Sequence, residues 1–398
     1  MASICMYFQV HQPLRLRKVQ LLSVLSGKLP ASPMDAYFNR ELNEQVFRKV
    51  AQKCYLPSNE LLLKLIAENG GDFRFSFSLT GVFLEQCRMF GADVLDSFRK
   101  LADTGCVDFL AETYYHSLAS FYRDPEEFSR QVAMHHEAIK SLLGVTPRVF
   151  RNTESIFSND IAQRAEAMGY AGIVAEGTEG ALGGRSPNFL YRPRGCKKIN
   201  ALLRNYPLSD DVGYRFSSHG WKEWPLTAEK YAAWLANCDG QCINIFLDFE
   251  TFGEHQWSET GIFSFLRHLP SECLRHPNLN FRMAREVAEW DARGEIDVHL
   301  PTSWADMERD LSAWLGNDMQ RACFDELQSL GAPAMRQGGE ALEAWRLLQS
   351  SDHLYYLCTK SLADGDVHKY FSHYQNPYEG FINYMNIIQD FKSRLGGA

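Results

Sequence analysis

The sequence lacks the cysteine patterns that bind zinc or form a redox dithiol. Its ten cysteines are scattered, and no two are spaced as CxxC. It also has no apolar run near the ~20 residues that cross a bilayer, so we expect no membrane association. The first residues show no basic start followed by an apolar segment and a cleavage site. Together with the scattered thiols, this leads us to expect a cytoplasmic protein.

Basic residues are also fewer than acidic residues. Lysine and arginine total 41 against 49 acidic residues, which gives a formal net charge of −8. We therefore expect no nucleic-acid partner, because such binding requires a basic surface. The 398 residues, 45% hydrophobic and 23% charged, suit one large globular domain with an accessory region. The oligomeric state is left open by the sequence.

Short β-rich runs alternate with longer amphipathic segments over the first 300 residues. The expected strands lie at 4–10, 72–79, 106–111, 148–152, 171–176, 200–205 and 243–249. This alternation predicts an α/β fold with parallel strands, an irregular seven-stranded (β/α)7 barrel over residues 1–300. A doubly wound open sheet would show the same alternation, and periodicity does not separate the two.

From about Ser303 the pattern becomes helical. We expect helices at 303–316, 319–331, 340–362 and 379–395, which together form a C-terminal α-helical domain over residues 301–398.

Polar side chains follow four of the expected strands. They are His11 with Gln12, Glu112 with His116 four residues further on, Glu154, and Asp248. Any one of them could be a helix cap or a solvated loop residue. In a β/α barrel, however, the chemistry gathers where the carboxyl ends of the strands meet. Four such positions on one rim predict an active site.

Two carboxylates across a pocket are what glycosidic cleavage requires. One stays ionised and attacks the anomeric carbon, while the other stays protonated and donates to the departing oxygen. Arg151 and Asn152 are suitable donors to hold Glu154 ionised. The segment 247–257 combines carboxylates, aromatic rings and a histidine, and Trp257 is the ring most expected to contact substrate.

These residues lie in segments that resemble glycoside hydrolase family 57, the group of amylases and 4-α-glucanotransferases. The similar segments are HQP at 11–13, AETYYH at 111–116, RNTES at 151–155, RNYPLSDDVGYRFS at 204–217, DFETFGEHQW at 248–257 and TSWADMERDLSAWLGN at 302–317. One tripeptide alone is weak, but six segments in order are specific.

The resemblance implies a retaining, α-amylase-like cleavage of α-1,4-glucosidic bonds. Glu154 would be the nucleophile and Asp248 the general acid/base. The substrate would be an α-glucan, such as starch or glycogen, or a maltooligosaccharide, and no metal or organic cofactor is implied. The residues expected to contact substrate or support the site are His11, Gln12, Glu112, His116, Asp210, Asp211, Trp257 and Trp304.

Three other functions remain open. A 4-α-glucanotransferase or branching enzyme would use the same two carboxylates, although the compact chain favours hydrolysis. A metal-dependent polysaccharide deacetylase would need two histidines facing one site, and the adjacent His135 and His136 project in different directions. A catalytically silent glucan-binding protein is disfavoured because both carboxylates are present.

Overall fold

The strands of the protein form two five-stranded sheets in the computed structural model, which describes residues 2–396. The first sheet contains β1 (Ala2–Val10), β2 (Phe75–Leu79), β3 (Val107–Phe109), β8 (Cys242–Asp248) and β9 (Leu279–Phe281). Their order is β3-β2-β1-β8, with β9 also on β1, and every pair is parallel. β1 is buried along its whole length, as expected for a central strand covered on both faces.

The second sheet has the order β10-β6-β7-β5-β4. Its strands are β4 (Val149–Arg151), β5 (Gly172–Glu176), β6 (Tyr191–Pro193), β7 (Asn200–Arg204) and β10 (Gly294–Ile296). All pairs are parallel except β6 with β7. The α/β class and the parallel strands are thus confirmed, and each of the seven expected strands coincides with a strand of the structure.

The two sheets contact each other at β3 and β4 and again at β7 and β8 without merging into one sheet. A single bridge between Ala111 and Phe150 joins the end of β3 to β4. On the other side the Asn205 amide donates to the Asn244 carbonyl at 2.9 Å. No closed sheet forms within residues 2–396, so the seven-stranded barrel is not confirmed.

Side chains explain the gap between β7 and β8. The Arg204 Nε donates to the Phe246 carbonyl, and the Asn244 Nδ2 donates to the Leu203 carbonyl, both at 2.9 Å. These side chains satisfy carbonyl groups that a continuous ladder would pair with backbone amides.

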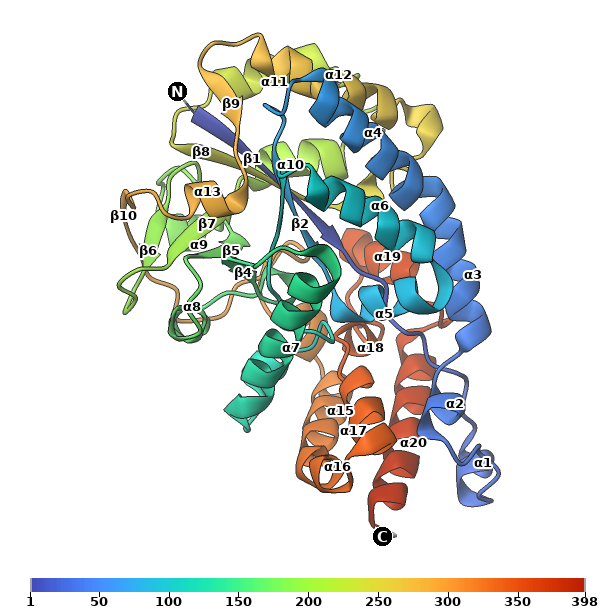
Figure 1. Cartoon of the computed structure of the whole chain (residues 1–398). Helices are drawn as coiled ribbons and strands as arrows, with labels where there is room; N and C mark the ends of the chain where they lie inside the picture. The colour runs from blue at the N-terminus through green and yellow to red at the C-terminus, as the bar shows by residue number, and fades with distance from the viewer. Residues whose placement is uncertain (1, 397–398) are drawn as a thin grey trace.

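Helices cover the sheets on their outer faces (Figure 1). Before residue 300 they are α1 (Leu21–Leu25), α2 (Pro33–Tyr37), α3 (Arg40–Val50), a π-helical turn (Ala51–Tyr55), α4 (Leu56–Glu68), α5 (Gly81–Phe90), α6 (Ala92–Asp103), α7 (Pro125–Leu143), α8 (Asn159–Ala167), α9 (Glu179–Leu182), α10 (Tyr206–Gly213), α11 (Ala228–Ala236), α12 (Ile262–Leu274) and α13 (Ala284–Val287). Among the described residues, no helix is long and apolar enough to cross a membrane.

The local sequence sets the ends of these helices, as α7 shows. The Asp124 side chain accepts from the Glu126 amide at its start, and Pro125 occupies the first turn. The helix ends at Gly144, whose φ of 68° is the left-handed conformation that glycine adopts at little cost.

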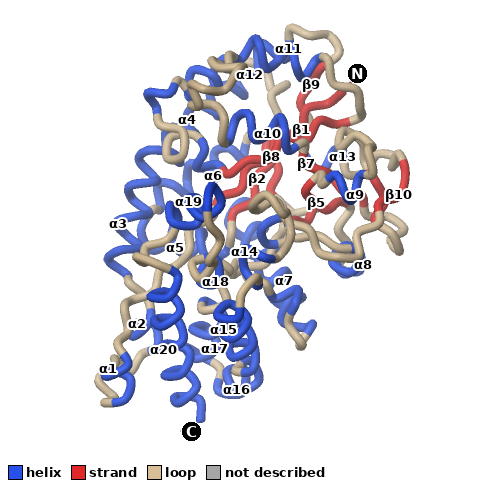
Figure 2. The backbone as a smooth tube through the Cα atoms, turned by 180° about the vertical axis from the view of Figure 1, so that it is seen from behind, coloured by secondary structure: helices blue, strands red, loops and turns tan. Residues whose placement is uncertain are grey.

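The C-terminal part of the chain is helical and lies at one end of the molecule (Figures 1 and 2). Its helices are α14 (Ser312–Leu315), α15 (Asp318–Ser329), α16 (Gly331–Gln337), α17 (Gly339–Leu347), α18 (Asp352–Tyr355), α19 (Leu362–Phe371) and α20 (Pro377–Gly396). Phe150 and Ile173 of the second sheet share one buried cluster with Trp314 and Tyr384 of these helices.

Two of the expected C-terminal helices are wrong. Residues 303–311 form an irregular loop in which Asp306 and Arg309 have positive φ, and only Ser312–Leu315 is helical. The helix expected over 340–362 breaks after Leu347 and restarts at Asp352. Both irregular segments contribute to the candidate site.

Candidate active site

The candidate site lies at the carboxyl ends of β1, β4 and β8. His11 directly follows β1, Glu154 follows β4 after a short turn, and Asp248 is the last residue of β8. Gln9 and Asp248 are partners in the parallel register of β1 and β8. Since parallel strands present their carboxyl ends at one edge, the three residues follow strand ends on the same side of the fold, and Glu154 is near enough to Asp248 to influence its pKa.

Glu154 sits in a strained turn. It has φ of 56° and ψ of 28°, and Ser155 after it also has positive φ. A non-glycine residue in this region costs about 1–3 kcal/mol and is held there by its surroundings. Here the Thr153 hydroxyl donates to the Ser117 carbonyl at 2.7 Å, which anchors the turn. The turn fixes the direction in which the Glu154 side chain leaves the backbone.

Both carboxylate oxygens of Glu154 are hydrogen-bonded. The His116 Nε2 lies 2.6 Å from Oε1, and the Trp304 indole Nε1 donates to Oε2 at 2.9 Å. Burial lowers the pKa of His116, but its bonds to Glu112 and Glu154 outweigh this and raise the pKa to about 9. At a pH below this pKa His116 is an imidazolium, and both of its nitrogens then donate.

This cation decides the ionisation of Glu154. Burial alone would raise the pKa of Glu154, but the hydrogen bond and charge of His116 lower it, with further help from Arg151 and Trp304. The net result is a pKa below the usual carboxyl range. Glu154 is thus an ionised carboxylate with its oxygens fixed in direction.

Glu112 is the counter-ion of His116. It is fully buried, accepts from the Ser78 hydroxyl and lies 3.3 Å from the His116 Nδ1. Burial works against its charge, but the bond from His116 and the charge of Arg151 bring its pKa down to about 2. The sequence left open whether Glu112 contacts substrate or supports the site. Its complete burial favours the supporting role.

Asp248 has the opposite environment to Glu154. Burial first, and the negative charge of Glu154 second, raise its pKa to about 6, while Arg151, Arg204 and His116 partly offset the rise. Two neighbouring carboxylates therefore differ in protonation over a slightly acidic range. This is the arrangement that acid-assisted displacement at a sugar carbon needs.

His11 belongs to the same cluster through its ring. It stacks on His116 with ring centroids 4.0 Å apart and an interplanar angle of 25°. Its Nδ1 lies 2.9 Å from the Thr80 hydroxyl and its Nε2 lies 2.8 Å from the Asp352 carboxylate. Both ring nitrogens thus have protein partners, so His11 positions His116 in this structure.

Asp352 is a site residue that the sequence analysis missed. It starts α18, directly after the break that divides the expected long helix, and Ser350 donates to it at 2.8 Å. Burial would raise its pKa, but the charge and hydrogen bond of His11 lower it strongly. A small-residue break, QSSD, inside a helical pattern was the one local signal available.

Trp304 also joins the site from the C-terminal part of the chain. Its ring lies 4.8 Å from the Arg151 guanidinium carbon and 5.8 Å from that of Arg204. Arg151 is completely buried, with its NH1 3.8 Å from Glu112. The two guanidinium groups hold the indole in place, and its N–H points at Glu154.

Asp210 and Asp211 are engaged in ion pairs beside this group. Arg204 donates to Asp210 at 2.5 Å and to Glu176 at 3.0 Å, and Asp211 accepts from Arg215 at 2.7 Å. Asp210 therefore supports Arg204, whereas Asp211 bonds away from the carboxylate pair. Arg204 and Glu176 were not singled out from the sequence.

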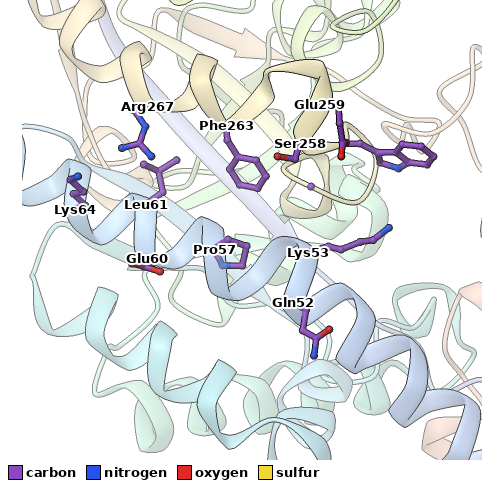
Figure 3. A pocket seen from close by; sticks show the side chains of 12 residues that line it. Gln52, Lys53, Pro57, Glu60, Leu61, Lys64, Ser258, Glu259, Phe263 and Arg267 are labelled. Atoms are coloured by element: carbon purple, nitrogen blue, oxygen red, sulfur yellow. The ribbon is translucent and has the colours of Figure 1, made fainter.

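The last two expected contact residues lie apart from the pair. Gln12 donates to the Tyr55 hydroxyl at 3.2 Å, and Tyr55 donates to Glu250 at 2.5 Å. Trp257 is 61% exposed and lies 5.6 Å from the Lys53 ammonium on a surface groove. Figure 3 shows this groove between α4 and α12.

Possible metal ligands elsewhere have other partners. Asp306, Glu308 and Asp364 have carboxylate oxygens within 4.8 Å of one another, but Lys360 bonds the first two at 2.7 Å each. His135 bonds the Leu79 carbonyl and the Glu112 amide, while His136 lies against Tyr170. The two adjacent histidines therefore point to different surroundings and do not face one common site.

Comparison with known proteins identifies the family of the chain. The pattern of glycosyl hydrolase family 57 matches residues 5–299, and the chain belongs to that family. A protein of Methanocaldococcus jannaschii named "Putative alpha-amylase" is 47% identical over 397 residues, which cover 97% of this chain and 83% of that one. The chain is therefore a glycoside hydrolase or a glucanotransferase.

Solved structures share the fold at low identity. A branching enzyme of Thermococcus kodakaraensis superposes with a TM-score of 0.68 at 14% identity, over 99% of this chain and 90% of that one. The 4-alpha-glucanotransferase of Thermococcus litoralis gives 0.67 at 16% identity over 89% of this chain. The alignment spans just 56% of that longer enzyme.

Proposed function

We propose that the protein is a retaining, α-amylase-like hydrolase of α-1,4-glucosidic bonds in α-glucans and maltooligosaccharides. Glu154 is the nucleophile and Asp248 the general acid/base. The observation that supports this assignment is the opposite displacement of their pKa values, down for Glu154 and up to about 6 for Asp248. At a pH between these two pKa values, each carboxyl group is in the protonation state that its step requires.

The steps follow from this assignment. Glu154 attacks the anomeric carbon as Asp248 gives its proton to the departing oxygen, which leaves a glycosyl ester on Glu154. Asp248, now a carboxylate, then takes a proton from water as the water oxygen displaces Glu154. His116 and Trp304 hold the Glu154 oxygens, so little reorientation precedes attack.

The proposal includes the architecture around the pair. The seven strands β1, β2, β3, β4, β5, β7 and β8 act as an interrupted barrel within a catalytic domain of residues 1–300. Residues 301–398 form the helical domain that completes the site with Trp304 and Asp352. A cytoplasmic location belongs to the same proposal.

Transfer to a sugar acceptor is the second candidate function. A 4-α-glucanotransferase or branching enzyme would use the same carboxylates, and both activities occur in the names of structural neighbours. Incubation with maltoheptaose separates the two, because hydrolysis yields only shorter chains and transfer also yields longer ones.

The assignment of the nucleophile is tested by Glu154→Gln. We expect loss of detectable activity on maltoheptaose with a cooperative thermal transition retained, because the amide is isosteric but cannot form the ester. Glu137→Gln, on the exposed side of α7, is the matched control and should retain full activity. Proton NMR of the first product should show the α-anomer. A β-anomer, or turnover by Glu154→Gln, would reject the mechanism.

A further inference from the structure

We propose that an aromatic rim of His255, Trp257, Tyr370 and Phe371 binds the chain of a polymeric α-glucan at a distance from the bond that is cleaved. The proposal rests on the proposed function and extends it from bond chemistry to preference for substrate length. Two separate parts of the chain build the rim: the loop after β8 supplies His255 and Trp257, and the end of α19 supplies Tyr370 and Phe371.

Three of these rings form one ordered cluster. The His255 ring lies 5.9 Å from Tyr370 and 5.6 Å from Phe371, and Tyr370 lies 5.0 Å from Phe371. All three contacts are close to perpendicular, with interplanar angles of 79°, 82° and 86°. Edge-to-face contacts fix the orientation of each ring, which reduces the entropy lost when a ligand stacks on it.

The rings are exposed despite this packing. Tyr370 is 59% exposed, Phe371 42% and Trp257 61%. Large rings held in fixed orientation and left open to solvent on one face of a protein are typical of binding surfaces. The C–H face of a glucose unit covers such a ring, while its hydroxyl groups stay in water.

The rim is built on segments that also lead to the candidate active site. Asp248 ends β8, and the loop that begins there carries His255. From the helical side, Tyr355 lies 6.4 Å from Phe371 and stacks on His368 of the same helix at 3.9 Å. In both Figures 1 and 2, α19 lies between the strands and the C-terminal helices. A chain that leaves the carboxylate pair can therefore reach the rim.

The charges around the rim favour an uncharged ligand. Glu254, next to His255, is paired with Lys49 at 2.5 Å and with Lys53 at 3.7 Å. Burial lowers the pKa of His255 to about 4, so its ring is neutral near neutral pH. Glu254 offsets part of the charge of the two lysines, and a neutral glucan needs no counter-charge.

The groove beside Trp257 offers room for more of the chain. Pro57, Leu61 and Phe263 form an apolar part of its wall, and Lys64 and Arg267 lie further along it (Figure 3). Its volume of about 690 Å³ falls within the range of ligand-binding cavities, roughly 300–1,000 Å³. An apolar wall bordered by polar groups matches the two faces of a glucan chain.

The test compares a polymer with a short substrate. The double variant Tyr370→Ala/Phe371→Ala should raise KM for glycogen about fivefold to tenfold, the loss of one or two ring contacts. Its kcat/KM for maltotetraose should stay within twofold of the unsubstituted protein, because a short chain does not reach the rim. The single variant Tyr370→Ala covers the case in which the double variant is unstable. Tyr378→Ala, equally exposed on α20, is the control.

Binding is measured separately by migration in native gels with and without glycogen. The unsubstituted protein should be retarded by glycogen, and the double variant should not. Because this needs no turnover, the rim is tested even if the protein proves inactive on α-glucans, which would reject the proposed function alone. The proposal would be overturned if the double variant and the unsubstituted protein had the same KM for glycogen and were equally retarded by it. An equal loss on both substrates, or a changed molar mass by light scattering, would also overturn it.

Discussion

Glu154 and Asp248 are chemically similar residues that differ in the charge around them. Glu154 accepts hydrogen bonds from an imidazolium and an indole, while Asp248 is partly buried and feels the negative charge of Glu154. The imidazolium exists because Glu112, itself fully buried, provides its second carboxylate partner. One histidine between two carboxylates thus lowers the pKa of Glu154, which follows β4, while the pKa of Asp248, at the end of β8, stays raised.

Residue-scale electrostatics predict the pH dependence of activity. Glu154 must be ionised, so kcat/KM falls on the acid side through its lowered pKa. Asp248 must be protonated, so kcat/KM falls on the alkaline side through a pKa of about 6. Loss of the His116 charge raises the pKa of both groups. His116→Gln should therefore move both limbs of the kcat/KM profile to higher pH and lower its maximum.

The control for this profile is His268→Gln, an exposed histidine on α12 that bonds the Ser264 carbonyl. Its profile should overlay that of the unsubstituted protein. Unchanged limbs in His116→Gln would show that this histidine does not set the ionisation of Glu154.

At the scale of elements, the break between α17 and α18 is as important as the helices it separates. It places Asp352 at the start of α18 within 2.8 Å of the His11 Nε2. His11 then bonds Asp352 through Nε2 and the Thr80 hydroxyl through Nδ1, which fixes its ring against His116. A continuous helix would carry this carboxylate elsewhere.

Asp352→Asn tests this contact. The amide loses the charge that orients His11, so we expect kcat to fall about tenfold and stability to fall by about 1–3 kcal/mol, the cost of disturbing a buried polar pair. KM for maltotetraose should change little. Asp318→Asn on the exposed start of α15 should alter neither quantity. Urea unfolding and steady-state kinetics measure both, and an unchanged kcat would limit Asp352 to a structural role.

For the whole molecule, one buried cluster spans the second sheet and the C-terminal helices. Phe150 and Ile173 lie in it with Trp314, Trp345 and Tyr384. The helices therefore cover an apolar face of the sheet in addition to supplying side chains to the site. Removing them would expose that face to water, at a cost of about 25 cal/mol for each Å².

The fragment of residues 1–300 tests this dependence. It lacks Trp304, Asp352 and the cover of the second sheet, so we expect an inactive protein that binds ANS and has no cooperative thermal transition. Near-UV circular dichroism and calorimetry measure this against the full chain. A fragment that melts cooperatively and cleaves maltoheptaose would show that the first 300 residues are self-sufficient.

Local pattern in the sequence was enough to predict the seven strands and the positions of Glu154 and Asp248 at strand ends. Strand identity depends on short apolar runs, and parallel strands necessarily share one edge for their carboxyl ends. These features can be predicted from residues that are neighbours in the sequence. The relation to family 57 followed from six ordered segments of the same kind and is confirmed.

Tertiary structure alone decided the rest. The sheets stay unclosed because the Arg204 and Asn244 side chains occupy carbonyl groups between β7 and β8. Trp304 reaches Glu154 from a loop with a helical sequence pattern, and Trp257 faces a surface groove. The pKa of Glu154 is lowered and that of Asp248 is raised by the combined effects of burial and of charged residues that are far apart in the chain. These contributions to the pKa depend on distances in space, which the local sequence pattern does not contain.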